Sequence, residues 1–153
     1  MKIVVLYDSV FGNTKKVAEA MADALKAKGA VTVSAADLKT EDIADADALV
    51  VGSPTRAFNP TPVMTGVLKS LPNLAGKKAL VFDTRSDKVD LDSKMFNFFE
   101  KFFGYAAAKM ARVLKRKGAA VVAEPMGFFV AGVEGPMKDG EIERATEWAK
   151  AIL

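Results

Sequence analysis

The sequence contains no cysteine and no histidine. Their absence excludes disulfides, thiolate nucleophiles, iron–sulfur ligands, histidine-containing zinc sites, an axial haem histidine and a Ser-His-Asp triad. We therefore predict no catalytic residue of these kinds and no metal site. If the protein carries out redox chemistry, a bound organic cofactor has to carry the electrons.

Long apolar runs and a strong charge excess are also missing. No stretch approaches the roughly 18 consecutive apolar residues of a membrane span, and Met1 and Lys2 lead directly into the apolar run Ile3–Leu6 without a cleavage signal. The 22 Lys and Arg residues against 19 Asp and Glu give a net charge of +3, too small to indicate nucleic acid. We expect a cytoplasmic protein that neither inserts into a membrane nor binds nucleic acid.

The composition is that of an ordinary soluble globule. Half of the 153 residues are hydrophobic and 27% are charged, which is far from the composition of a disordered chain. No linker or repeat interrupts the sequence. This length predicts one domain, residues 1–153, with a substantial core.

Short apolar, β-branched runs alternate with amphipathic segments along the chain. We predict strands at residues 2–7, 30–36, 48–52, 78–83 and 119–124, and helices at 14–28, 41–45, 61–71, in a long stretch ending at 117, and at 141–153. Every connection between strands is long enough for a helix, so the crossovers should be right-handed. The fold class is α/β, a doubly wound five-stranded parallel sheet, in which ligands bind beyond the carboxyl ends of the strands.

The loop after the first strand suits a phosphate group. It combines two hydroxyls, an amide and a flexible glycine at the start of a helix, in the order Ser9, Val10, Phe11, Gly12, Asn13 and Thr14. The alternative is a plain helix N-cap by Asn13 or Thr14. The loop is neither a Walker motif nor the G-x-G-x-x-G dinucleotide fingerprint.

Two further loops are expected at the same edge. The second offers charge, an aromatic ring and an amide between two prolines, in Pro54, Thr55, Arg56, Ala57, Phe58 and Asn59; the third begins with Asp83, Thr84 and Arg85. Taken singly, the second could be a stiff connection with Phe58 turned inward, and Arg85 could pair with Asp87 or Asp90. Taken together, the three loops describe a site for a planar heterocycle that carries one phosphate.

At these residues the chain resembles the flavodoxin family. The resemblance rests on residues 9–14, on Gly52–Thr55 and on the strand spacing across nearly the whole chain, and residues 82–85 and 134–141 are similar to small stand-alone flavodoxin-domain proteins of microbes. It implies strand order 2-1-3-4-5 and FMN as cofactor. It also implies that residues 9–14 hold the FMN phosphate and that the second and third loops hold the ring.

The function implied is that of an FMN-binding electron-transfer protein. Two alternatives stay open: a flavin-dependent NAD(P)H or quinone reductase on the same fold, and a binding module without flavin. An FMN-binding electron-transfer protein would be an electron carrier, whereas the reductase would be an enzyme.

The chain departs from the family in two ways. Flavodoxins are strongly acidic, whereas this chain is net positive and places Arg56 and Arg85 where the ring is expected. A nearby guanidinium stabilises a reduced, anionic flavin, so we expect a less negative potential. The third loop also has no aromatic residue to stack on the ring, which leaves Phe11, Phe58 or the Phe96–Tyr105 segment as candidates.

Two surfaces suggest partners. The six aromatic residues of the Phe96–Tyr105 segment exceed what a core-facing helix buries, so they predict packing on the sheet or in a homodimer, or a lid or docking surface. Residues 109–117 form a basic helix end. Cations there match the helix dipole, and the functional alternative is an acidic redox partner protein.

Overall fold

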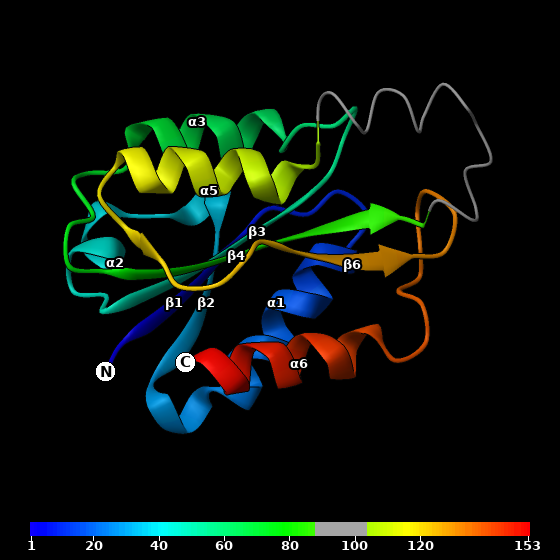
Figure 1. Cartoon of the computed structure of the whole chain (residues 1–153), viewed down its shortest axis with the longest axis horizontal. Coiled ribbons are helices and arrows are strands. Elements are labelled where there is room, and N and C mark those ends of the chain that lie inside the picture. Colours follow the sequence, from blue (N-terminus) through cyan, green and yellow to red (C-terminus); the bar gives the residue numbers. More distant parts are fainter. Residues whose placement is uncertain (88–103) are drawn as a thin grey trace.

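The computed structural model describes residues 1–87 and 104–153. A parallel sheet lies between two layers of helices (Figure 1). Its strands are β1 (Ile3–Tyr7), β2 (Ala30–Ser34), β3 (Ala48–Pro54), β4 (Lys78–Ser86), β5 (Ala120–Val121) and β6 (Met126–Val130). The helices are α1 (Asn13–Ala24), α2 (Thr40–Ala44), α3 (Pro62–Ser70), α5 (Ala106–Arg116) and α6 (Glu141–Ile152), with short 3-10 helices η1 (Lys26–Lys28) and η2 (Ala35–Asp37). The order β2-β1-β3-β4-β5 confirms the flavodoxin-like α/β fold.

The central strands are apolar because both faces of the sheet are covered. Successive side chains point to opposite faces, so Val4 joins the core beneath α3 and α5, and Val5 joins the core beneath α1 and α6. The register pairs Tyr7 with Gly52 and Gly52 with Phe82. Strands β1, β3 and β4 therefore end at one edge, where their loops meet.

Helix α1 is shorter than its sequence pattern indicates. The prediction of a helix over residues 14–28 overran by one turn, because α1 ends at Ala24 and the chain tightens into η1. Gly29 then turns the chain with a φ of 79°. A Cβ atom at this position would lie 2.5 Å from the Met1 carbonyl oxygen, so the close approach to β1 requires glycine.

The fifth position of the sheet differs from the prediction of one strand at 119–124. Two short strands share it: β5 pairs with Lys78 and Ala79 of β4, and β6 pairs with the stretch from Phe82 to Ser86. Pro125 lies between them and has no N–H to donate to the ladder. The predicted strand ran past the end of β5 at Val121, and the prediction missed β6.

Strands β3 and β4 run further than predicted. They end at Pro54 and Ser86 instead of residues 52 and 83, because backbone pairing continues to the partners Pro54 and Thr84. Asp83, Thr84 and Arg85 therefore lie on a strand rather than in a loop. Regular pairing holds these side chains in defined directions.

Some expectations fall on residues 88–103, which lie outside the described part of the chain. They include the first part of the long helical stretch that was expected to end at residue 117, and most of the Phe96–Tyr105 segment. The roles of this segment as homodimer contact, lid or docking surface therefore stay predictions. Within residues 1–87 and 104–153, none of the helices has both the length and the apolar character that crossing a membrane requires.

Candidate functional site

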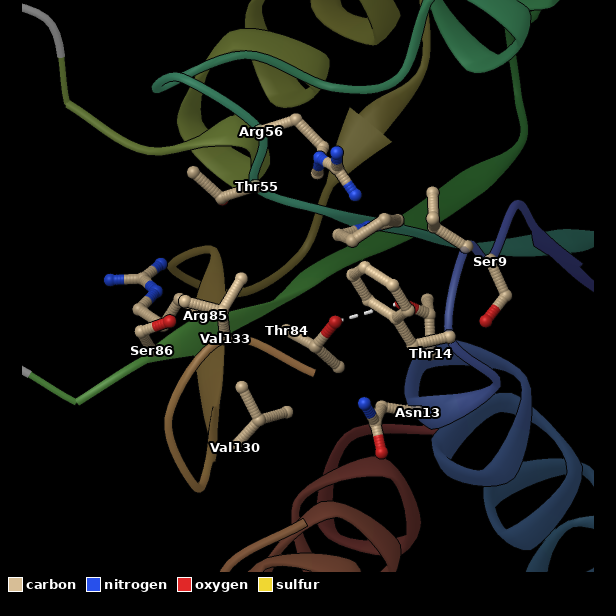
Figure 2. A pocket seen from close by; sticks show the side chains of 13 residues that line it. Ser9, Asn13, Thr14, Thr55, Arg56, Thr84, Arg85, Ser86, Val130 and Val133 are labelled. Atoms are coloured by element: carbon tan, nitrogen blue, oxygen red, sulfur yellow. Dashed lines mark hydrogen bonds between the residues drawn. The ribbon is translucent and has the colours of Figure 1, made fainter. Parts of the chain in front are cut away.

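In the ranges that the structure describes, buried polar side chains gather at the carboxyl edge of the sheet. They are Asn13, Thr14, Ser53, Thr61, Asp83 and Thr84. A polar group buried without a hydrogen bond costs about 1–3 kcal/mol, so this concentration needs internal partners or a ligand. Figure 2 shows a pocket at this edge, with side chains from separate loops pointing into it.

The turn between β1 and α1 presents backbone donors. Gly12 has a φ of 91°, in the left-handed region that favours glycine, and precedes the first residue of α1. The N–H groups of Gly12 and Lys15 donate to Ser9 Oγ over 3.1 and 3.3 Å. The N–H groups of Asn13 and Thr14 belong to the first helical turn, where helix geometry supplies no acceptor. With the helix dipole, they favour an anion.

A pair of hydroxyls joins this turn to β4. The Oγ1 atoms of Thr14 and Thr84 lie 2.7 Å apart and share one hydrogen bond, drawn as the dashed line in Figure 2. Thr14 is 1% and Thr84 4% exposed. Two hydroxyls carry two hydrogens, and one bond uses one of them. The other hydrogen has no acceptor within residues 1–87 and 104–153, so it is available to a ligand.

The second loop closes into a two-residue turn. Arg56 and Asn59 exchange both backbone hydrogen bonds, of 2.8 and 2.9 Å. Between them, Ala57 and Phe58 have φ values of 46° and 65°, the geometry of a type I′ hairpin turn. The Arg56 guanidinium carbon lies 5.4 Å from the centre of the Phe11 ring, within cation–π range. This contact brings the first and second loops together.

Arg85 is bound to a buried acid. Its Nε and Nη2 donate to the two carboxylate oxygens of Asp83 over 2.6 and 2.8 Å, and its guanidinium carbon lies 3.5 Å from the centre of the Tyr105 ring. The surface pairing considered from the sequence, with Asp87, is replaced by this one, and Asp87 instead contacts Lys138 over 3.0 Å. Arg85 lines the pocket, but Asp83 compensates its charge.

The start of α5 depends on the same edge. The N–H groups of Ala106 and Ala107 donate to Thr55 Oγ1 over 3.1 Å and to Asp83 Oδ2 over 2.9 Å. Burial raises the pKa of Asp83 above its ordinary value, while hydrogen bonds from Arg85 and the Ala107 N–H act in the opposite direction. Thr55, which follows β3, and Asp83 of β4 thus position the start of α5 relative to the pocket.

A fourth loop, which the sequence analysis did not assign to the site, closes the pocket from the side of β6. Val130 and Val133 line the pocket, and Asn13 Nδ2 donates to the Glu134 carbonyl oxygen over 2.8 Å. A Cβ atom on Gly135 would lie 2.5 Å from the Asn13 amide, so glycine permits this contact. The signal for this side of the pocket is the apolar run after Pro125, which the sequence analysis assigned to no element.

The pocket gathers ten of the fifteen predicted site residues. They are Ser9, Val10, Phe11, Asn13, Thr14, Pro54, Thr55, Arg56, Thr84 and Arg85. Gly12 shapes the first turn, and Asp83 acts behind Arg85. Ala57, Phe58 and Asn59 lie on the turn beyond Arg56 and do not line the pocket. Ser86, Val130 and Val133 were not predicted.

The donor set fits a flavin mononucleotide. A phosphate needs several hydrogen-bond donors and a favourable potential, which the first turn of α1 and the unshared threonine hydrogen supply. A flavin ring needs apolar and aromatic surface, and Val10, Phe11 and Val133 supply it because they are 50%, 46% and 63% exposed. Residues present at this edge therefore match both parts of the molecule.

A doubly wound parallel sheet with an anion-accepting turn before its first helix defines the class of α/β proteins that bind ligands at the carboxyl edge. Within this class, the sequence matches the Flavodoxin domain family over residues 4–129. The chain belongs to the flavodoxin family. A comparison with curated protein sequences found no match.

Solved structures with this fold include flavodoxins and larger enzymes. A flavodoxin from the domain Archaea is 22% identical, with a TM-score of 0.74 and coverage of 99% of this chain and 96% of that one. Fusobacterium nucleatum flavodoxin bound to flavin mononucleotide is 18% identical, with a TM-score of 0.68 and coverage of 98% and 95%. Rubredoxin oxygen:oxidoreductase from Desulfovibrio gigas is 23% identical, with a TM-score of 0.73, but this chain spans 35% of its length and is itself 99% covered. These identities show a shared fold.

Proposed function

We propose that the chain binds FMN at the carboxyl edge of the sheet and serves as an electron-transfer protein of the flavodoxin type. The observation that carries the proposal is the set of unused donors at one point: the first-turn N–H groups of α1 and the unshared hydrogen of the buried Thr14–Thr84 pair. When bound, FMN supplies the chemistry of one- and two-electron transfer.

The residues present divide the binding work between two sides of the pocket. Asn13, Thr14 and Thr84 would hold the phosphate through backbone N–H groups and the free hydroxyl hydrogen. Phe11 and Arg56 would lie against the flavin ring, since both line the pocket and contact each other. These residues bind and orient the cofactor, and none of them needs to gain or lose a proton during electron transfer.

The first test is binding. The purified protein, stripped of any flavin it carries, is titrated with FMN and with riboflavin, and the flavin fluorescence is followed. We expect FMN to bind at least tenfold more tightly than riboflavin, because the phosphate meets charge-assisted hydrogen bonds of about 1.5–3 kcal/mol each. Folded protein that leaves the fluorescence of FMN unchanged would remove the proposal.

A matched pair of variants locates the phosphate. The double variant Thr14→Val, Thr84→Val removes both buried hydroxyls from the pocket, and Thr146→Val removes an exposed hydroxyl of α6 that donates to the Glu143 carbonyl. We expect the double variant to weaken FMN binding about tenfold to a hundredfold and riboflavin binding far less. Thr146→Val should bind both ligands as the parent chain does. Equal weakening of FMN and riboflavin by the double variant would place the phosphate elsewhere.

A further inference from the structure

We propose that the groove between α3 and α5 docks an acidic segment of a partner protein whose apolar side chain enters the groove. This inference rests on the proposed electron-transfer function, because it names the kind of partner that would exchange electrons with FMN bound in the pocket. The groove encloses about 160 Å³, close to a cavity that admits a benzene-sized group. Its main apolar and basic lining residues are Pro60, Leu68, Lys69, Lys109, Met110 and Val113.

Charge is separated along the sequence in a way that the net value hides. Residues 48–82 and 104–123 contain nine Lys and Arg residues and no Asp or Glu. The rest of the chain, with thirteen basic and nineteen acidic residues, has a net charge of −6. Helices α3 and α5 lie in the basic stretches and next to each other on one face of the sheet (Figure 1). The surface formed by α3 and α5 therefore carries a positive field that steers acidic partners, whereas the neighbouring segment of η2 and α2 on the same side of the sheet is acidic.

The cations of this face lack carboxylate partners among the described residues. The basic residues of these two helices are Lys69 on α3 and Lys109, Arg112, Lys115 and Arg116 on α5. None of them takes part in an ion pair formed within residues 1–87 and 104–153. The opposite layer differs: α1 and α6 contain the pairs Lys15–Glu19, Arg144–Glu141 and Lys150–Glu147. An isolated surface cation is ordinarily just solvated, but a row of such cations beside an apolar groove has the composition of an interface with a polar rim.

Lys109 connects the groove with the cofactor pocket. Its Nζ donates to Asn59 Oδ1 over 2.7 Å. Partial burial and the charge of Arg112 lower the pKa of Lys109, so an incoming carboxylate would be a better partner than the amide. Asn59 in turn exchanges two backbone hydrogen bonds with Arg56, which lines the pocket. A partner in the groove would therefore touch the turn that borders the cofactor site.

Other occupants fit less well. The acidic residues around α2 could offer charge from a second copy, but the large apolar residues there, Leu38 and Ile43, pack in this chain's own core and cannot fill a groove elsewhere. Nucleic acid would meet the cations but gains nothing from the apolar floor of Leu68, Met110 and Val113. An acidic segment with a leucine or methionine matches both features.

The experiment uses a fluorescein-labelled peptide in which glutamates surround two leucines, and it measures anisotropy with flavin-free protein. We expect binding that weakens at least tenfold when sodium chloride rises from about 50 to 300 mM, because the charges are exposed to screening. A second peptide with serine in place of both leucines should bind at least tenfold more weakly at either salt concentration. Equal binding of both peptides would overturn the proposal that an apolar side chain enters the groove.

Charge-reversal variants locate the surface. The double variant Lys69→Glu, Lys109→Glu should weaken peptide binding at least tenfold, and the milder Lys69→Gln, Lys109→Gln should weaken it in the same direction. The matched control Lys26→Glu changes charge on η1, away from the groove, and should bind as the parent does. Unchanged binding by both double variants would overturn the proposal.

Four further outcomes separate the alternatives. Tighter binding of a twenty-nucleotide oligothymidylate than of the peptide, lost in the double variants, would assign the face to nucleic acid. A dimer on size-exclusion chromatography that the double variants convert to a monomer would assign it to a second copy. Peptide binding at the groove by a protein that never binds FMN would keep this inference and remove the proposed function, and an FMN-binding protein that ignores the peptide would do the reverse.

Discussion

Two glycines show at the residue scale how backbone conformation and not space decides a substitution. A Cβ atom added to Gly12 or to Gly66 would meet no atom within 4 Å, but Gly12 has a φ of 91° and Gly66 lies inside α3. We expect Gly12→Ala to destabilise the fold by about 1–2 kcal/mol through left-handed strain. Gly66→Ala should stabilise it by up to about 1 kcal/mol through helix propensity.

Urea unfolding followed by Trp148 fluorescence measures both changes. FMN affinity adds a second readout, since Gly12 shapes the proposed phosphate turn and Gly66 does not line the pocket. Gly12→Ala should weaken FMN binding, and Gly66→Ala should leave it unchanged. If both variants moved stability in the same direction, the conformational argument for Gly12 would fail.

Arg56 is the residue expected to tune the bound flavin. Because Asp83 compensates Arg85, Arg56 is the pocket cation without an ion pair among described residues. A cation near the ring stabilises the reduced anion, so Arg56→Gln should make the potential of the last reduction step more negative. A charge interaction at an exposed site contributes about 0.5–1 kcal/mol, which corresponds to a shift of about 20–40 mV in the one-electron reduction potential.

Potentiometry of the FMN-loaded protein measures this shift, with Arg116→Gln as the control. Arg116 is an exposed cation at the far end of α5 and does not line the pocket, so its removal should change the potential by a few millivolts at most. Equal shifts in the two variants would show that overall charge, and not Arg56 itself, sets the potential.

At the scale of elements, the carboxylate of Glu141 joins α6 to β6. Glu141 accepts hydrogen bonds from the Phe129 N–H over 2.7 Å and from Arg144 Nε and Nη2 over 2.9 and 2.7 Å. Partial burial acts to raise the pKa of Glu141, but the hydrogen bonds from Arg144 and Phe129 outweigh it and lower the pKa below its ordinary value of 4.5. The carboxylate therefore stabilises the folded state more than the unfolded one.

The sign of the pH dependence follows from this lowered pKa. The stabilisation is fully present above pH 4.5 and is lost as the pH falls through the folded-state pKa. We expect Glu141→Gln to reduce the free energy of unfolding by about 1–2 kcal/mol at neutral pH, with the deficit shrinking below pH 4.5. Urea unfolding at several pH values measures it.

Glu147→Gln is the control for this pH profile. Glu147 also lies on α6 and pairs with Lys150, but its side chain is 74% exposed, so its removal should change stability little at any pH. A Glu141→Gln deficit that stayed constant from neutral to acid pH would show that the lost stability comes from packing and not from the charge.

The sequence predicted those elements whose form is set locally or by burial on both faces. The apolar runs of β1, β3 and β4 and the motif at residues 9–14 predicted the parallel sheet and much of the pocket, and the resemblance to flavodoxins implied the strand order. The sequence did not predict the pairing of Arg85 with Asp83, because that pairing depends on where β4 ends. It also did not predict the contact of Asn13 with the fourth loop, because Gly135 has to let the two segments approach. Local pattern carries no information on such contacts.

For the whole molecule, stability and ligand binding are assigned to separate regions. Two apolar cores, one on each face of the sheet, contain the large buried side chains. The buried polar groups of the described ranges stand together at one edge. A ligand that satisfies them should therefore add to the stability of the whole fold, because it binds the folded state and not the unfolded chain.

Thermal unfolding measures this linkage with FMN, riboflavin and inorganic phosphate. At a free concentration of one hundred times its Kd, a ligand of the folded state adds about 2.7 kcal/mol, which raises the Tm by about 5–11 °C for a domain of this size. FMN should give the full shift, and riboflavin at the same concentration a smaller one because it lacks the phosphate that α1 receives. Inorganic phosphate should give a small shift that FMN abolishes by competition. Equal shifts from FMN and riboflavin would mean that the ring is bound and that the turn at Gly12 contributes nothing to the affinity.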